Sequence, residues 1–245
     1  VHIMYYKNIT NFQKVETVAN STALETEYPG GAKNLEGVIY TNIQNYVGGK
    51  NLPLIAGQGD TGARLDKTPA AARYAKCALS PNFKKLINKD DFEVLPQYFY
   101  EGKHIEYQFI PFSLPLILIN GSTGIGSGHA QNILPRSVDN IKKYIQLYLN
   151  NKTPKDDLLL PYYNGFKGKV ERIADRQYSI KGCISRINKT ELEITDMPPS
   201  FNYKSAIKLL DNLEEKKIIK SYDDLCDPKK DVLLFRVKME STELE

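Results

Sequence analysis

A glycine-rich turn followed by a run of small residues is the feature that most constrains this chain. Residues 57–64 read GQGDTGAR, and residues 70–74 read AAARY. Glycines and alanines let another backbone approach closely, and the neighbouring cations suit a phosphate group. A tyrosine hydroxyl can act as a nucleophile. The segment therefore predicts a surface on which a phosphodiester lies against Tyr74 beside Arg73, although an ordinary loop with a half-buried packing tyrosine fits the same residues.

The composition is that of an ordinary globular protein. The chain has 245 residues, of which 41% are hydrophobic and 25% charged, enough for one large or two modest domains. A net charge of +4 does not by itself predict nucleic-acid binding. Three widely spaced cysteines argue for a reducing compartment and against a disulfide framework or a zinc site. No apolar run is long enough to span a bilayer, and no signal peptide opens the chain, so we expect a cytoplasmic protein.

The first half of the chain alternates helical and strand patterns. Residues 13–26 and 34–46 have helical spacing, and 28–31 (YPGG) break it. Two short helices joined by a glycine turn are typical of a helix-turn-helix in a winged-helix fold, and equally of any helical hairpin. We expect Asn34 to cap the second helix and Val38 to lie on its buried face. The further expected elements are a strand at 53–56, a strand at 74–79 (or a helix starting at 68–69), a helix from 80, and a β-hairpin within 92–112.

A second glycine-rich stretch follows a predicted buried strand at 114–120. Residues 121–128 read GSTGIGSG, close to the dinucleotide fingerprint of NAD(P)-dependent short-chain dehydrogenases. Pro135 lies only nine residues past Gly126, too close for the amphipathic helix that the fingerprint requires, so we disfavour this alternative. Beyond it we expect a helix after 135–137 with Tyr148 facing inward. Short strands are expected at 167–172, 177–182, 184–187, 190–195, 217–221 and 232–239, with a helix at 203–215.

The motifs GQGDTGAR, AAARY and LINGSTGIGSG, at their separation, resemble the breakage-reunion region of type IIA DNA topoisomerases. That family includes gyrase A, ParC, phage medium subunits and the eukaryotic topoisomerase II core, and the resemblance leans towards the phage and eukaryotic forms. It covers residues 14–239. It implies an α+β fold, with a winged-helix DNA-cleavage domain at 1–115 and an α/β tower domain at 116–245. The coiled-coil gate of the family has no counterpart here.

The resemblance also implies roles for individual residues. Tyr74 would attack a DNA phosphate to form a transient phosphotyrosyl link, and Arg73 would help to hold that phosphate. Ile125 matches the isoleucine that wedges between base pairs in the family. The residues expected to supply positive charge to DNA are Arg64, Lys67, Lys76 and Lys33.

One departure from the family bears on catalysis. Members usually carry two histidines and an acid where this chain has Pro29, Gly30, Gly31 and Ala32. A histidine there is thought to aid the transition state, so its loss shifts that role to Lys33 or leaves a non-catalytic DNA-binding or scaffold module, which is the alternative function.

The resemblance further implies partners and cofactors. Double-stranded DNA is the expected substrate, and ATP-dependent strand passage the expected reaction. The toprim/ATPase subunit or domain would bind most of the Mg²⁺ and the ATP, because no toprim-like acidic set is recognisable here. A homodimer within a larger assembly is expected, with no membrane association. It would be located with the cellular DNA, or in a host cell if the chain is viral. His2, His104 and His129 have no metal-ligand spacing, so we expect no metal site in this chain.

Overall fold

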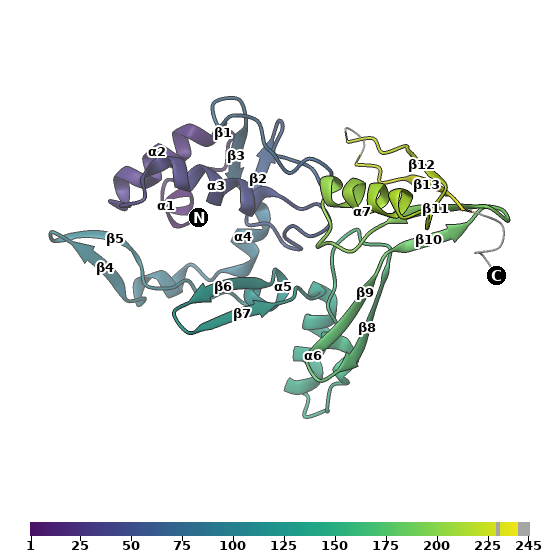
Figure 1. Cartoon of the computed structure of the whole chain (residues 1–245). Coiled ribbons are helices and arrows are strands. Elements are labelled where there is room, and N and C mark those ends of the chain that lie inside the picture. The colour runs from purple at the N-terminus through teal and green to yellow at the C-terminus, as the bar shows by residue number, and fades with distance from the viewer. Residues whose placement is uncertain (229–230, 240–245) are drawn as a thin grey trace. The chain divides into compact units, whose positions relative to one another are not determined.

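The computed structural model describes residues 1–228 and 231–239 (Figure 1). The chain divides into two compact units. The first comprises Val1–Asn45, Gly49–Gly62 and Thr68–Leu159; the second comprises Tyr46–Gly48, Ala63–Lys67 and Leu160–Glu245. The main division thus falls at 159/160, not at the expected 115/116, and the expected end of the second domain, 240–245, lies outside the described residues.

The first unit contains a small three-stranded sheet with helices beside it (Figure 1). The strand order is β1-β3-β2, and both pairings are antiparallel. In chain order, the elements of the whole first unit are α1 (His2–Tyr6), β1 (Gln13–Lys14), α2 (Val15–Glu25), α3 (Gly31–Ile43), β2 (Ile55–Gln58), β3 (Lys76–Leu79), α4 (Pro81–Leu86), a 3-10 turn (Asp90–Glu93), β4 (Gln97–Tyr100), β5 (Lys103–Tyr107), α5 (Leu116–Ile119), β6 (Ser122–Gly126), β7 (His129–Ile133), α6 (Val138–Leu149) and a second 3-10 turn (Asp156–Leu159).

Helices α2 and α3 confirm the two expected helices, with shifted boundaries. Helix α3 begins at Gly31 with Gly30 as its N-cap, so Asn34 lies inside the helix and does not cap it. Val38 was expected on the buried face but is 51% exposed. The face that packs into the core passes through Leu35, Ile39 and Ile43, spaced four residues apart, and Val38 lies beside this face.

The predicted strand at 114–120 is wrong. Residues Leu116–Ile119 form the single helical turn α5, in which the Leu118 and Asn120 amides donate to the carbonyls of Pro115 and Leu116 at 2.9 and 2.8 Å. A four-residue apolar run does not distinguish a buried strand from a buried helical turn. The proline at the start of the turn, whose φ is −73°, fits a helix N-terminus.

Two β-hairpins follow the sheet. The β4–β5 hairpin confirms the expectation for 92–112, with its turn at Glu101 and Gly102. The β6–β7 hairpin spans the second glycine-rich stretch, which therefore does not open a helix as a dinucleotide fingerprint would. Helix α6 starts where expected, with the Ser137 hydroxyl accepting from the Asn140 amide, but Tyr148 is 70% exposed and does not face inward.

The division at 159/160 follows from contacts made by two asparagines. The side-chain amide of Asn51 donates through its Nδ2 to the backbone carbonyls of Ile119 and Arg136, at 3.1 and 3.0 Å. The Asn120 side chain accepts from the amide of Leu52 and donates to its carbonyl, at 2.8 and 3.0 Å. These bonds attach the β6–β7 hairpin and the start of α6 to the first unit.

The second unit is a four-stranded antiparallel sheet with one long helix and a separate hairpin. The sheet order is β10-β11-β13-β12, and the hairpin is β8–β9. Its elements are β8 (Lys169–Ala174), β9 (Gln177–Lys181), β10 (Cys183–Arg186), β11 (Glu191–Asp196), α7 (Tyr203–Glu215), β12 (Ser221–Asp224) and β13 (Phe235–Lys238). Helix α7 matches the expected range and begins with a capping box between Asn202 and Ser205. Its buried residues, Ala206 and Leu210, pack with Phe235 of the sheet. The strand expected at 217–221 begins only at Ser221.

Candidate functional site

Tyr74 occupies a tight turn between two buried alanines. The Tyr74 amide donates to the Ala71 carbonyl at 2.8 Å, and the following residues enter β3. Ala72 is 5% exposed and Ala75 is fully buried. The small side chains of Ala72 and Ala75 pack inward, and the larger side chains of Arg73 and Tyr74 between them are exposed. Of the three alanines in the motif, Ala72 is buried, Ala70 is partly buried and Ala71 is exposed.

The first turn of α2 holds the backbone of Ala72 and Ala75 in place. The amides of Val15 and Glu16 donate to the carbonyls of Ala75 and Ala72, at 3.0 and 3.2 Å. Amides in the first turn of a helix have no partner within the helix, so these bonds satisfy both groups. No helix starts at 68–69, the alternative that the sequence left open, since residues 66–71 have no regular secondary structure.

Tyr74 itself is exposed, and its ring lies under a guanidinium. The residue is 69% exposed, and the Arg73 Cζ lies 4.9 Å from the centroid of the Tyr74 ring. Such a cation–π contact at an exposed site contributes about 0.5–1 kcal/mol and orients the ring. The structure therefore brings together the two residues expected to be catalytic, with the hydroxyl accessible to a macromolecule.

Two other ionisable groups beside the turn are held in their neutral forms. Tyr40 of α3 donates its hydroxyl to the Ala70 carbonyl at 2.7 Å, and burial raises its pKa. Cys77 of β3 is buried, and burial raises the pKa of its thiol to about 11. Both groups therefore stay protonated at neutral pH, and both are buried, whereas the phenol of Tyr74 belongs to an exposed residue.

A pair of lysines lies next to the tyrosine on the sheet. Lys76 of β3 is paired in register with Lys14 of β1 on one side and with Gln58 of β2 on the other. All three side chains are exposed, and in the described part of the chain neither lysine has an acidic partner. Like charges in register on adjacent strands destabilise a sheet. Lys14 also sits at the N-cap of α2, the positive end of the helix dipole. The charges of Lys14 and Lys76 and the positive end of the α2 dipole thus lie close together. A bound anion would reduce the repulsion among them.

Lys76 was expected from the sequence, whereas Lys14 was missed. Lys14 lies 60 residues before the tyrosine in the sequence, and only the β1–β3 pairing brings it to the site. The one available signal was its place at the start of the helix predicted over 13–26, where a cation is unfavourable.

Lys33, suggested as the replacement for the histidine that aids the transition state, is already paired with an acid. Its ammonium forms an ion pair with Glu36 one turn along α3, with the Nζ 2.6 Å from Oε2. The Lys33 side chain remains 88% exposed, but the neighbouring carboxylate offsets its charge. Pro29 and Gly30, which stand where the resemblance places the histidines, directly precede α3, with Gly30 as its N-cap.

Arg64 requires a correction. It was expected to contact DNA, yet the residue is only 8% exposed and its guanidinium is committed within the second unit. Its Nη2 lies 2.5 Å from the Asp196 Oδ1 and donates to the Met197 carbonyl at 2.6 Å. A buried guanidinium paired in this way presents no charge to a ligand. Lys67, the other predicted cation of this loop, is exposed and also belongs to the second unit.

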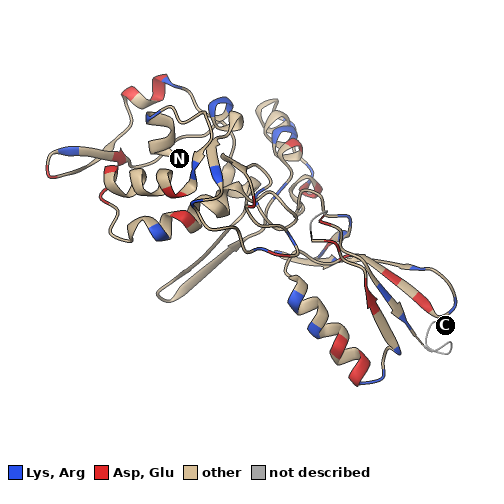
Figure 2. Cartoon of the chain, turned by 90° about the horizontal axis from the view of Figure 1, so that it is seen from above, with Lys and Arg blue, Asp and Glu red and all other residues tan. Residues whose placement is uncertain are grey.

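Ile125 lies near the tip of the β6–β7 hairpin and is 91% exposed. No Lys, Arg, Asp or Glu occurs between Ser122 and Ile133, and the hairpin is tan along its length in Figure 2. Gly121 at its base has φ +68°, and a Cβ there would lie 2.6 Å from the Ile133 carbonyl oxygen, so only glycine fits. The structure thus holds one bare apolar side chain on a neutral, projecting ribbon.

The residues around Tyr74 do not fit a divalent cation. Mg²⁺ prefers carboxylate and other oxygen ligands, whereas Arg73, Lys76 and Lys14 are all cationic. No group of three or more His, Cys, Asp or Glu side chains is arranged to hold a metal ion in residues 1–228 and 231–239. In the same part of the chain, no helix has the length and apolar character needed to cross a membrane.

Several known proteins are similar to this chain in sequence. The family model that describes the A-type subunits of DNA gyrase/topoisomerase IV matches residues 1–245. The chain is 33% identical over 223 residues to the mitochondrial DNA topoisomerase 2 of Dictyostelium discoideum, covering 90% of this chain and 17% of that protein. It is 32% identical over 223 residues to the DNA topoisomerase medium subunit of Enterobacteria phage T4, covering 89% of this chain and 48% of that protein.

A solved structure shares the fold. The crystal structure of the Plasmodium falciparum topoisomerase II DNA-binding, cleavage and re-ligation domain superposes with a TM-score of 0.91 at 29% identity, covering 99% of this chain and 33% of that chain. The chain thus spans less than half the length of each of these relatives. The match along the whole sequence shows that this chain belongs to the type II topoisomerase family of DNA gyrase/topoisomerase IV A-type subunits.

Proposed function

We propose that this chain is the DNA-cleavage and religation region of a type IIA topoisomerase, with Tyr74 as the nucleophile. The observation that carries the proposal is the exposed phenol on a rigid turn, flanked by Arg73 and by the Lys14–Lys76 pair. The relatives support the same function by their names, which are those of a DNA-binding, cleavage and re-ligation domain and of a topoisomerase medium subunit.

The reaction follows from the chemistry of these groups. The Tyr74 oxygen attacks the phosphorus of a DNA phosphodiester, and a bond forms between them. The bond from phosphorus to one deoxyribose oxygen breaks; the phenolic proton is lost and the departing sugar oxygen gains one. The reverse reaction reseals the strand without an external energy source. Arg73, Lys14 and Lys76 would stabilise the extra negative charge on the pentavalent phosphorus.

The two units would correspond to the family's domains. We assign the winged-helix domain to the sheet and helices α1–α4 of the first unit, with α2 and α3 as its helix-turn-helix. The second unit, with its antiparallel sheet, would be the tower that guides the DNA arms. The bare Ile125 fits a wedge that opens a base step and bends the duplex, since an apolar side chain exposed on a neutral ribbon has no other stabilising contact.

Strand passage would need further components. The donor set beside Tyr74 does not suit Mg²⁺, so we assign the metal, together with ATP, to a toprim/ATPase partner or to a further domain of the protein. When bound, Mg²⁺ would polarise the phosphate and the leaving oxygen. Cleavage of both strands of a duplex needs two tyrosines, which is why we propose a homodimer within the larger assembly.

A trapping assay tests the proposal. The protein is incubated with supercoiled plasmid, Mg²⁺ and a toprim/ATPase partner, and detergent is added to denature any cleavage complex. Protein-linked linear DNA is the expected product. A gel shift that weakens with salt, without covalent product at any condition, would instead identify the alternative, a non-catalytic DNA-binding module that has lost the family histidines.

Charge removal at the lysine pair provides an independent prediction. Lys14→Gln or Lys76→Gln is expected to weaken DNA binding about threefold to tenfold and to reduce the salt dependence of log K by about 0.9 for each lost phosphate contact. In the absence of DNA, each variant is expected to be as stable as the original protein or up to about 0.5 kcal/mol more stable, because cross-strand repulsion is removed.

Lys103→Gln is the matched control for this experiment. Lys103 is an exposed lysine at a strand end of the β4–β5 hairpin, which lies apart from the β1–β3 pair in Figure 1. DNA affinity and its salt dependence should be unchanged in this variant. If Lys14→Gln lowered stability and left the salt dependence intact, the lysine would have a structural role and not a role in phosphate binding.

A further inference from the structure

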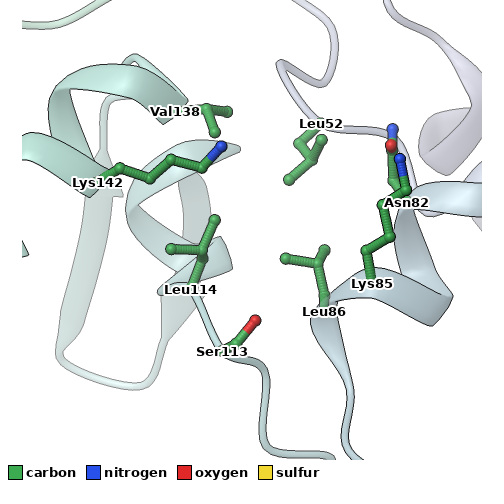
Figure 3. A pocket seen from close by; sticks show the side chains of 8 residues that line it. All are labelled: Leu52, Asn82, Lys85, Leu86, Ser113, Leu114, Val138 and Lys142. Carbon is green, nitrogen blue, oxygen red and sulfur yellow. The ribbon is translucent and has the colours of Figure 1, made fainter.

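A cavity in the first unit lies away from the tyrosine turn. It has a volume of about 340 Å³ and opens between α4, the segment before α5 and the first turns of α6 (Figure 3). Ligand pockets in proteins are about 300–1,000 Å³. Its lining residues are Leu52, Asn82, Lys85, Leu86, Ser113, Leu114, Val138 and Lys142.

The walls of this cavity are fixed by backbone hydrogen bonds. The Ser113 amide donates to the Leu86 carbonyl at 2.8 Å, which joins the segment before α5 to the end of α4. Leu52 is held on both its amide and its carbonyl by the Asn120 side chain. These bonds fix the backbone positions of Leu52, Leu86 and Ser113 in the walls of the cavity.

The surface of the cavity has an apolar floor and a cationic rim. Leu52, Leu86 and Leu114 converge on the hollow in Figure 3, with Lys142 extending from α6 and Lys85 along the opposite wall. The lining contains no Asp or Glu. Both lysines are exposed, and neither has an ion-pair partner among the described residues. Two ammonium groups that flank three leucines are complementary to a molecule with an apolar body and an anionic group.

We propose that this cavity binds a small amphipathic anion, an aromatic or medium-chain carboxylate of about ten to fifteen non-hydrogen atoms. The size follows from the volume, since a water molecule occupies about 30 Å³ in the liquid. The apolar body would contact the leucines, and the carboxylate would bridge Lys85 and Lys142. The proposal is independent of the chemistry at Tyr74, because neither Tyr74 nor Arg73 lines the cavity.

Binding of 1-naphthoate, compared with its neutral isostere 1-naphthamide, tests this site on the full chain by calorimetry. The naphthoate is expected to bind at least about fivefold more tightly than the amide. Lys85→Met and Lys142→Met should each weaken naphthoate binding about twofold to fivefold, and the double variant about tenfold, since a partly exposed ion pair contributes up to about 1 kcal/mol. Amide binding should not change.

Neighbouring lysines provide the controls. Lys84→Met and Lys143→Met remove one charge each from the same two helices, at exposed residues that do not line the cavity, and should leave naphthoate binding unchanged. Equal affinity for naphthoate and naphthamide would overturn the proposal. So would an equal loss in the control variants, or displacement of the naphthoate by duplex DNA, which would assign these lysines to a DNA surface.

Discussion

Tyr74→Phe is expected to lower the yield of covalent protein–DNA adduct at least about 1,000-fold while leaving DNA affinity within about twofold. Loss of a nucleophile removes the chemical step and leaves only the contribution of binding. The substitution deletes one oxygen and keeps the ring that contacts Arg73. The turn is held by backbone bonds of Ala72 and Ala75, so it should keep its conformation. Detergent trapping measures the adduct, and a gel shift at fixed salt measures the affinity.

Tyr148→Phe is the matched control for this variant. Tyr148 is as exposed as Tyr74, at 70% against 69%, and lies on α6 of the same unit. Its replacement should leave both adduct yield and affinity unchanged. Detection of covalent DNA adducts with Tyr74→Phe would refute the assignment of the nucleophile, whereas equal loss of adduct in both variants would indicate a general effect of removing surface hydroxyls.

Asp196→Ala is expected to destabilise the second unit by about 3–5 kcal/mol, because it leaves a buried guanidinium without its counter-charge. Asp196 is 2% exposed and Arg64 is 8% exposed. The carboxylate also accepts from the amides of Lys167 and Met197, at 2.7 and 2.8 Å. Its removal therefore leaves three donors without an acceptor. Urea denaturation followed by far-ultraviolet circular dichroism measures the free energy of unfolding.

Two further variants make this result interpretable. Asp223→Ala removes a partner from the exposed ion pair with Lys238, whose atoms lie 3.2 Å apart, and should cost no more than about 1 kcal/mol. The double variant Arg64→Met with Asp196→Ala should be more stable than Asp196→Ala alone, since it removes the unpaired buried charge. A loss from Asp196→Ala no larger than that from Asp223→Ala would show that the buried pair is not important for stability.

The local features of the fold were largely predictable from the sequence. Helix α7 and the β4–β5 hairpin are marked by strong periodicity and turn residues, and both occur where expected. The exposure of Tyr74 did not follow from the pattern, because a half-buried packing tyrosine fits the same residues. The short run Leu116–Ile119 was misjudged because four apolar residues carry no periodicity, and its helical form is set by hydrogen bonds that the pattern does not contain.

The contacts that could not be predicted are those between residues far apart in the sequence. Arg64 was grouped with the other cations of its loop because its sequence neighbours suggested a phosphate site. Its partner, Asp196, lies 132 residues further on, in a strand with no sequence signal linking the two. Lys14 was overlooked for the same reason, since strand register and not sequence proximity places it beside Lys76. The family resemblance pointed to Tyr74 as the proposed nucleophile, but it did not distinguish which cations are accessible.

The assignment of Ala63–Lys67 to the second unit has a consequence for how the protein can be dissected. A truncated protein that starts at residue 160 would contain the carboxylate of Asp196 without the arginine that neutralises it, and would be expressed in a poorly folded form. During translation, the ribosome adds 132 further residues after Arg64 before its partner, Asp196, is present in the chain. Separation of the units at their apparent junction is therefore a poor design, and a soluble version of the later unit would need residues 63–67 supplied as a grafted or co-expressed peptide.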